Sequence, residues 1–292
     1  MHLPVMVDEV VRLLQPERGG LFVDCTVGLG GHASALLAAG ATRVIGLDRD
    51  PAALARSRER LAPWADRVEL VHADYRTLDA VLDARGIDRI DGALADLGVS
   101  SMQLDEGRGF SFRRDEPLDM RMDTTQGDTV ADLLARADEA EIADAIYQFG
   151  EERHSRRVAR AIVTARQSAP ITTTGQLAAL VRRAIPTHGW QRIDPATRTF
   201  QGLRIWANQE LEGLDRFLAA AARRLDAGAR LAVIAFHSLE DRIVKHTFRT
   251  LDRVDAVVRV VTRHPLVASD EEIAGNPRAR SAKLRVAERV VA

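Results

Sequence analysis

Cysteine, lysine and aromatic residues are scarce in this chain of 292 residues. Its single cysteine, Cys25, excludes an internal disulfide and a cysteine-rich metal site. Cys25 lies in an apolar stretch, where a buried packing role is expected. Only Lys245 and Lys283 are lysines, so nearly all basic residues are arginines. This use of cysteine favours a cytoplasmic location over an oxidising compartment.

The chain also lacks a long apolar run and a strong net charge. No run of about 18 apolar residues occurs, so we expect no membrane-spanning helix. Asp8, Glu9 and Arg12 interrupt the first apolar stretch, and a signal peptide is therefore not expected. The net charge of −1 gives no overall nucleic-acid signature. A hydrophobic content of 46% supports a full core in one large domain or two modest ones.

A glycine-rich turn follows the first predicted strand. Glycine occurs at positions 28, 30 and 31, and a helix-compatible run begins at Ala33. Glycine lets a ligand approach the backbone, because it has no Cβ and tolerates a positive φ. The spacing G-x-G-G differs from the G-x-G-x-x-G of dinucleotide-binding proteins, so the turn alone fits a structural role as well as a binding role.

Acidic residues end the next predicted strands. Asp48 closes a strand 18 positions after Gly30, where a carboxylate can accept hydrogen bonds from both ribose hydroxyls of an adenosine. Asp74 ends the third predicted strand and Asp96 the fourth. Ligands of open α/β sheets bind at the carboxyl ends of the strands. The pattern therefore predicts a nucleoside-containing cofactor in a doubly wound α/β domain.

The pattern of alternating strands and helices changes after residue 105. We expect a discontinuous α/β domain of residues 1–105 and 205–292, interrupted by a helical insertion at 106–204. The insertion should begin with a loop bearing exposed aromatics, Phe110 and Phe112. Thr173 or Thr174 should cap one of its helices. The predicted helices cover residues 129–137, 139–149, 154–166, 174–184 and, as one long helix, 199–225. Further strands are predicted at 229–237 and, as an antiparallel pair at the sheet edge, at 256–262 and 283–291.

Arginine is concentrated in the predicted insertion. Residues 151–206 hold ten arginines against three acidic residues. The planar guanidinium suits bidentate contacts with phosphate and stacking on bases. Solvated helix faces are the alternative interpretation, and they are the more common one for a generic arginine-rich helix.

Several ordered motifs have a composition that folding alone does not require. They include Phe149-Gly-Glu-Glu-Arg153 and Phe236-His-Ser-Leu-Glu-Asp-Arg242, and others lie at 95–105, 108–112, 117–123, 194–204 and 276–285. Each motif is weak alone, but the ordered set is specific. From His2 to Arg285, it closely resembles the ribosomal RNA small subunit methyltransferase H family. Met102 stands where that family usually has proline.

The resemblance implies an S-adenosylmethionine-dependent enzyme with a Rossmann-like class I methyltransferase sheet and an inserted helical domain. It implies methylation of the exocyclic N4 of a cytidine in the decoding region of 16S rRNA, in the small ribosomal subunit. The residues that match the family's cofactor site are Gly30, Gly31, His32, Asp48, Tyr75, Asp96 and Gln103. Methyl transfer requires no metal, and the histidines show no metal-binding spacing.

Asp96, Ser100 and His237 are the candidate catalytic residues. An acceptor for the amino N–H would help turn the nitrogen lone pair toward the methyl group. Asp96, Ser100 or the backbone near Gly98 could supply it, unless Asp96 serves only the cofactor. His237 has either a structural or a substrate role. The motif Asp96-Leu-Gly-Val lacks the aromatic residue of other amino-methyltransferases, so Phe110, Phe112 or Phe236 could stack on the base.

Two basic groups are expected to bind RNA. They are Arg153, Arg156, Arg157 and Arg160 in the insertion, and Arg278, Arg280, Lys283 and Arg285 before and at the start of the last predicted strand. Ion pairs of Arg157 and Arg160 with Glu151, Glu152 or Asp144 are the alternative. A small-molecule methyltransferase, a non-catalytic ribosome-assembly factor and an NAD-dependent oxidoreductase are competing functions. The oligomeric state stays open, with a homodimer among the options.

Overall fold

The computed structural model describes residues 4–186 and 193–290, and the chain divides into two compact units. Unit 1 comprises Met1–Gly98 and Leu211–Ala292, and unit 2 comprises Val99–Glu210. The sequence placed these boundaries at 105/106 and 204/205. They lie a few residues away because the fourth strand ends at Asp96 and the last helix of unit 2 continues to Asn208.

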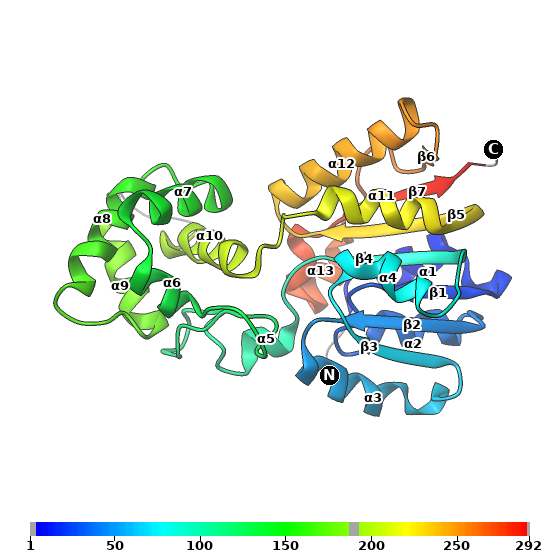
Figure 1. Ribbon diagram of the computed structural model, residues 1–292, viewed down its shortest axis with the longest axis horizontal. Helices are drawn as coiled ribbons and strands as arrows, with labels where there is room; N and C mark the ends of the chain where they lie inside the picture. Colours follow the sequence, from blue (N-terminus) through cyan, green and yellow to red (C-terminus); the bar gives the residue numbers. More distant parts are fainter. Residues whose placement is uncertain (1–3, 187–192, 291–292) are drawn as a thin grey trace. The chain divides into compact units, whose positions relative to one another are not determined.

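Unit 1 is built on a seven-stranded sheet with the order β3-β2-β1-β4-β5-β7-β6 (Figure 1). Strands β1 to β5 are parallel, and the order reverses between β1 and β4, which is the switch point of a doubly wound sheet. The predicted Rossmann-like α/β class is therefore confirmed. The parallel strands are β1 (Leu21–Asp24), β2 (Arg43–Asp48), β3 (Val68–His72), β4 (Ile90–Asp96) and β5 (Leu225–Ala235).

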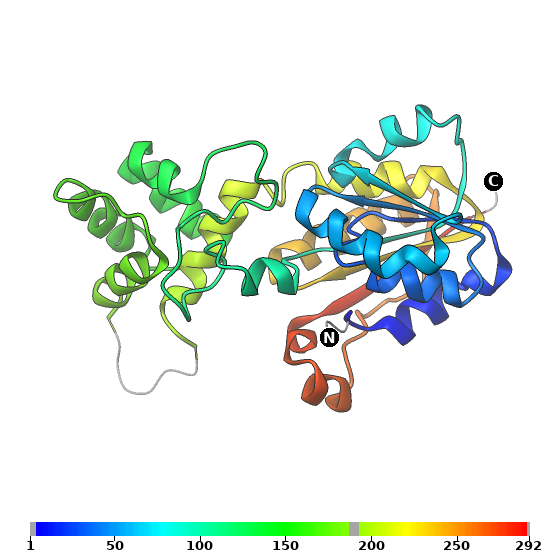
Figure 2. The same ribbon diagram turned by 90° about the horizontal axis from the view of Figure 1, so that it is seen from below.

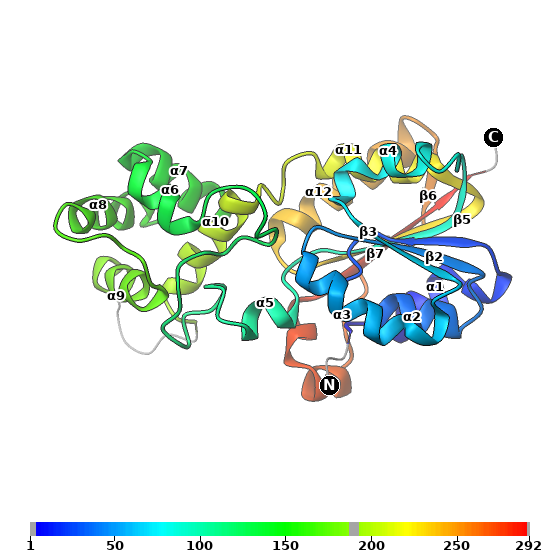
Figure 3. The ribbon, with the colours of Figure 1, turned by 60° about the horizontal axis from the view of Figure 1, so that its bottom comes forward.

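Helices cover both faces of this sheet (Figure 3). Successive strand residues point to opposite faces, so Phe22 and Val23 of β1 belong to different apolar clusters. The cluster around Phe22 includes residues of α1 (Val7–Leu14), α2 (Gly31–Ala38) and α3 (Pro51–Leu61). The cluster around Val23 includes residues of α4 (Leu78–Asp83), α11 (Leu214–Arg224) and α12 (Ser238–Arg253).

The two late strands form the predicted antiparallel pair at one edge of the sheet. β6 (Val258–Val260) pairs with β7 (Lys283–Arg289), and β7 also pairs antiparallel with β5. β7 therefore lies between β5 and β6, and β6 alone is the edge strand on this side of the sheet. The short helix α13 (Asp270–Gly275) lies in the connection between them.

Unit 2 is helical, and Figure 2 shows its longer helices, coloured green to yellow-green, gathered into one bundle. Its helices are α5 (Ser101–Asp105), α6 (Val130–Arg136), α7 (Glu139–Gly150), α8 (Ser155–Arg166), α9 (Thr174–Ala184) and α10 (Ala196–Asn208). Thr173, one of the two expected caps, accepts from the backbone N–H of Gln176 in a capping box. None of the helices in the described residues is long and apolar enough to cross a membrane.

The single helix predicted at 199–225 is wrong. Helix α10 ends at Asn208, and α11 begins at Leu214. Gln209 has a left-handed backbone (φ 50°), which ends the hydrogen-bond pattern of α10, and Gly213 repeats this conformation before α11. The carboxylate of Glu210 receives two hydrogen bonds from the Arg204 guanidinium, at 2.9 and 2.8 Å.

The loop between α5 and α6 is packed against its own unit. Phe110 is 8% exposed, and Phe112 packs edge-on against Phe200 with ring centroids 4.8 Å apart. The buried Asn208 accepts from the Met122 backbone N–H and donates to the Met120 carbonyl, both at 2.7 Å. Phe110 is therefore a core residue of unit 2, which removes it as a stacking partner for a base, and Phe112 is half-buried rather than exposed.

Candidate functional site

The carboxyl ends of three neighbouring strands of unit 1 carry aspartates. Asp24 ends β1, Asp48 ends β2 and Asp96 ends β4. β1 pairs in parallel with both β2 and β4, so the three strands end at the same edge of the sheet. This edge is at the switch point, where open α/β sheets bind their ligands.

The glycine turn between β1 and α2 has the conformation that its sequence predicts. Gly28 (φ 51°) and Gly30 (φ 76°) are both left-handed, a region that L side chains rarely adopt. The Gly30 N–H donates to the Val27 carbonyl at 2.7 Å, and α2 begins at Gly31. A Cβ added to Gly28 would meet only the Thr26 carbonyl oxygen, at 3.8 Å. The backbone at Gly28 is therefore open to a neighbouring group.

Asp48 is tied to the glycine turn. Its carboxylate accepts the Gly28 N–H at 2.7 Å and the Asp50 N–H at 2.8 Å. Burial raises the pKa of Asp48 to about 6, although these two hydrogen bonds lower it. Each carboxylate oxygen has a second lone pair, so Asp48 can hold the turn and still accept a ligand hydroxyl.

Asp24 is a site residue that the sequence interpretation missed. It is 1% exposed, and one of its carboxylate oxygens (Oδ2) has no hydrogen-bond partner among the described residues. Burial raises the pKa of Asp24 to about 7, with the charge of Asp48 adding to the shift, although the backbone amides of Thr26 and Ala33 lower it. Its position at the end of the strand before the glycine turn was the available signal.

Asp96 lies beside His32 at the start of α2. The His32 Nδ1 is 3.7 Å from an Asp96 carboxylate oxygen, and its Nε2 is 2.9 Å from the Val5 carbonyl. The carbonyl can only accept, so Nε2 carries a proton. Burial and the charges of Asp24 and Glu240 raise the pKa of Asp96 well above its usual value. Its Oδ1 is also buried with no partner among the described residues.

Tyr75 follows β3 at the same edge of the sheet. Its ring is half-buried, and its centroid lies 4.6 Å from that of Phe217 in α11. The preceding Asp74 binds Arg76 at 2.7 Å and Arg49 at 3.5 Å. These contacts fix the backbone on either side of Tyr75.

Ser100 and Gln103 belong to unit 2, where they cap α5 together. The Ser100 hydroxyl accepts the Gln103 N–H at 3.2 Å, and the Gln103 side-chain oxygen accepts the Ser100 N–H at 3.0 Å. Gln103 is 5% exposed. This capping box starts α5 without a proline at position 102.

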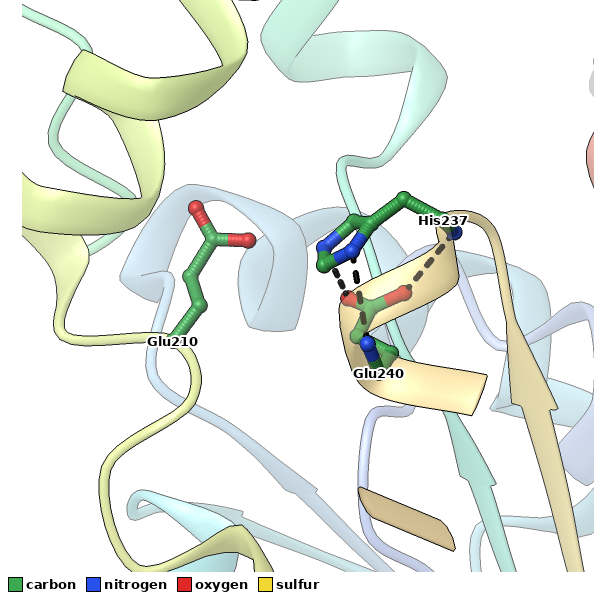
Figure 4. Close-up of side chains that lie close together, drawn as sticks. All are labelled: Glu210, His237 and Glu240. Atoms are coloured by element: carbon green, nitrogen blue, oxygen red, sulfur yellow. Dashed lines mark hydrogen bonds and ion pairs between the residues drawn. The ribbon is translucent and has the colours of Figure 1, made fainter. Parts of the chain in front are cut away.

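His237 is the N-cap of α12 (Figure 4). Its Nδ1 faces the Glu240 N–H at 3.4 Å, and its Nε2 is 3.1 Å from a Glu240 carboxylate oxygen. The other oxygen of Glu240 accepts the Phe236 N–H at 2.8 Å. Of the two roles open to His237, these contacts support the structural one. Glu210, also drawn, belongs to unit 2, where Arg204 binds it.

Arg153 and three arginines of α8, at positions 156, 157 and 160, are exposed, whereas Arg166 at the end of α8 is half-buried and donates to backbone carbonyls of α6 and its C-cap. Arg153, Arg156 and Arg157 make no ion pair or side-chain hydrogen bond within the described residues, whereas Arg160 pairs with Glu139 at 3.3 Å. The alternative of ion pairing therefore holds for Arg160, with a different acid from those expected. Because residues one turn apart share a helix face, Arg156, Arg157 and Arg160 form an exposed basic stripe on α8.

The second basic group divides into exposed and paired residues. Arg285 is 6% exposed, and its Nε donates to Asp241 at 2.6 Å. This burial contradicts the expected RNA contact of Arg285. Burial alone would raise the pKa of Asp241, but Arg285 and Lys283 lower it on balance. Lys283 is also 3.4 Å from Asp241, whereas Arg280 is exposed and Arg278 is half-buried.

The residues of this edge suit a positively charged nucleoside cofactor. Asp24 and Asp96 each present a buried carboxylate oxygen without a partner among the described residues. A cation close to these two side chains would favour their ionised forms. Asp48 offers acceptors for ribose hydroxyls, and the Gly28 backbone is open. S-adenosylmethionine carries a sulfonium and an ammonium group, and it has a ribose, so the donor set and the cofactor agree.

Comparison with known proteins gives full-length matches. The model of the MraW methylase family matches residues 1–290. Ribosomal RNA small subunit methyltransferase H of Sorangium cellulosum is 50% identical, covering 99% of this chain and 91% of that protein. The protein of the same name from Geotalea uraniireducens is 47% identical, with coverage of 99% and 98%. A putative methyltransferase of Streptococcus mutans, solved in complex with SAH, is 13% identical with a TM-score of 0.45, covering 99% of this chain and 100% of that one.

Proposed function

The chain belongs to the MraW methylase family, and we propose that it methylates the exocyclic N4 of a cytidine in the decoding region of 16S rRNA. S-adenosylmethionine is the methyl donor. The observation that carries the proposal is the full-length similarity to relatives named ribosomal RNA small subunit methyltransferase H, at about half identity. A small-molecule methyltransferase and a non-catalytic assembly factor are not favoured by this match. Such an enzyme would act in the cytoplasm, on the small ribosomal subunit.

The proposed cofactor site uses the glycine turn and the strand ends of unit 1. Gly30, Gly31 and His32 are assigned to the methionine end, and Asp48 to the ribose. Tyr75 is assigned to the adenine, and Asp96 and Gln103 to further contacts. We add Asp24, because its unpartnered buried oxygen requires a donor or a cation.

The cofactor supplies a methyl group on a positively charged sulfur. The amino nitrogen of cytosine is a poor nucleophile, because its lone pair is delocalised into the ring. An acceptor on one amino N–H favours the orientation in which the lone pair meets the methyl group, and we assign that acceptor to Asp96. Its raised pKa favours the protonated form, and a cation beside it restores the carboxylate, which is the accepting form.

The cytidine must leave any base stack before it reaches such a site. The exposed arginines Arg153, Arg156 and Arg157 of unit 2 are proposed to bind phosphates of the surrounding RNA. Of the two expected basic groups, this one has more side chains without a protein partner. Phe112 and Phe236, both half-buried, are the remaining candidates for stacking on the base, since Phe110 is a core residue.

The test uses purified protein, labelled S-adenosylmethionine and small ribosomal subunits that lack the modification. We expect one methyl group per subunit, located on N4 of a cytidine by mass spectrometry of nuclease fragments. Label on cytosine C5 or on a ribose 2′-oxygen, with none on N4, would contradict the proposed reaction. Turnover of a small molecule with no RNA binding would favour the small-molecule enzyme instead.

A further inference from the structure

The segment Pro4–Met6 packs directly on the glycine turn of the proposed cofactor site. The Val5 carbonyl accepts from the His32 Nε2 at 2.9 Å. The Pro4 ring lies so close to Gly31 that a Cβ added there would be 2.8 Å from the proline Cγ. The segment therefore contacts the two residues at which α2 begins, and it limits how far either of them can move.

This segment is held in one conformation by burial. Val5 is 5% exposed, and Met6 is completely buried in the apolar cluster that includes α1 and α2. Met6 nevertheless has a left-handed backbone, with φ 54° and ψ 39°. Such a conformation is unfavourable for a residue with a side chain, and it persists only where surrounding contacts impose it.

One of those contacts comes from the distant helix α13. The Met6 N–H donates to a carboxylate oxygen of Glu272 at 2.7 Å, across 266 positions of the sequence. Glu272 is itself fixed by the start of its helix, because its N–H donates to the Ser269 hydroxyl at 3.1 Å. A helix that carries none of the proposed cofactor residues thus holds the segment that contacts Gly31 and His32.

The segment also determines how His32 faces Asp96. Because the Val5 carbonyl requires a proton on Nε2, a neutral His32 presents the unprotonated Nδ1 toward Asp96, 3.7 Å away. Loss of the Val5 contact would free the ring to rotate. The position of Pro4–Met6 is therefore coupled to the carboxylate assigned to the cofactor and to the amino group.

We propose that Pro4–Met6 is a strap that closes the methionine end of the cofactor site, and that Glu272 is the positioning residue that keeps it closed. The proposal rests on the proposed function, because it takes the cofactor to lie at Gly30–His32. The strap retains bound S-adenosylmethionine and orients His32. Glu272 touches neither cofactor nor substrate, so its effect is on the residence time of the cofactor.

The first test compares Glu272→Ala with Glu271→Ala by stopped-flow dissociation of S-adenosylmethionine. Glu271 is the exposed neighbour in the same helix and has no partner within the described residues, so it controls for changes in α13. We expect Glu272→Ala to release the cofactor at least fivefold faster and to raise KM for it more than it lowers kcat. Glu272→Gln keeps an oxygen acceptor and should restore most of the wild-type rate.

The second test acts on the strap from the opposite side. Gly31→Ala should displace Pro4 and speed release of the cofactor, and the double variant with Pro4→Gly should recover, because the ring that clashes is gone. Equal release rates for Glu272→Ala and Glu271→Ala would overturn the proposal. If Glu272→Ala does not fold, failure of Pro4→Gly to rescue Gly31→Ala would overturn it instead. Wild-type protein that binds no S-adenosylmethionine would contradict the proposed function itself.

Discussion

At the carboxyl edge of the sheet, the protonation states of three aspartates depend on one another. Asp24, Asp48 and Asp96 lie close enough that Asp48 raises the pKa of Asp24, and Asp24 that of Asp96. A positively charged ligand relieves this repulsion and favours the ionised forms. Cofactor binding is therefore coupled to proton release at these residues.

We expect the affinity for S-adenosylmethionine to depend on the pKa of Asp24. Its pKa of about 7 means that binding must expel a proton at lower pH. The affinity should fall by about tenfold per pH unit below pH 7, with a further decline near pH 6 from Asp48. Calorimetry in buffers of different ionisation enthalpy measures both the affinity and the released proton. Asp24→Asn should bind more weakly and with a flatter pH dependence, and an unchanged pH profile would contradict this role.

The raised pKa of Asp24 predicts an opposite effect on folding stability. The contribution of Asp24 to the free energy of unfolding is fully present below the pKa that its carboxyl has in the unfolded chain. This contribution is lost as the pH rises toward 7. A carboxyl whose pKa rises from its ordinary value to about 7 on folding loses on the order of 4 kcal/mol of stability across this range. Relative to wild type, cofactor-free Asp24→Asn should therefore gain stability between pH 4 and pH 7. Urea unfolding at several pH values tests this, and a constant difference would exclude the effect.

Asp96→Asn separates the two roles of Asp96. The substitution keeps the size of the side chain and one acceptor but removes the charge. We expect turnover to fall about tenfold or more beyond the loss of cofactor affinity, since a charge-assisted hydrogen bond contributes about 1.5–3 kcal/mol. Single-turnover kinetics and calorimetry on one preparation measure both quantities. Equal losses of affinity and turnover would restrict Asp96 to the cofactor.

The sequence predicts which residues lie at this edge of the sheet better than it predicts what they contact. Asp48 and Asp96 follow from the rule that parallel strands end at one edge, and the same rule could have identified Asp24. Sequence reasoning could not decide between roles for His237, because its contacts with Glu240 depend on how α12 starts. Arg285 reads as a basic surface residue until β7 is placed beside β5, where Asp241 binds it.

Among the elements, α8 carries the clearest prediction for RNA binding. Replacing Arg156 and Arg157 together by alanine should weaken RNA binding and reduce its salt dependence by about two units of slope, about one per lost phosphate contact. Arg249 and Arg253 in α12 are equally exposed and form the matched control. Filter binding across salt concentrations measures the slope, and cofactor affinity should not change. The same slope in both double variants would mean that Arg156 and Arg157 do not contact RNA phosphates and only form a hydrated surface of α8.

Most strands and helices could be predicted, because their apolar periodicity and caps are local. The break at Gln209 could not, since residues 199–225 have a continuous helical pattern, and only the left-handed Gln209 and Gly213 separate two helices of different units. Phe110 and Phe112 look like loop aromatics for a similar reason. Their burial depends on partners such as Phe200 that lie far along the chain.

At the scale of the whole molecule, the two units have separate apolar cores. The cluster that includes Leu134, Ile146 and Leu203 contains residues of unit 2 only, whereas both clusters beside the sheet contain residues of unit 1 only. Residues 99–210 produced alone should therefore fold into a helical protein that unfolds cooperatively. We expect them to bind RNA and not S-adenosylmethionine. Circular dichroism and calorimetry test this, and an unfolded fragment would show that unit 2 needs unit 1.

The position of β7 has a consequence for synthesis on the ribosome. β7 is made after β6, yet it lies between β5 and β6 in the sheet. Unit 2 lies within residues 99–210 and can fold while the remainder is still being translated, since domains generally fold as units during synthesis. The sheet of unit 1 is completed later, because β6 has no neighbouring strand until residues 283–289 have left the exit tunnel. A nascent chain thus passes through a stage in which residues 99–210 are folded while the sheet of unit 1 still lacks β7.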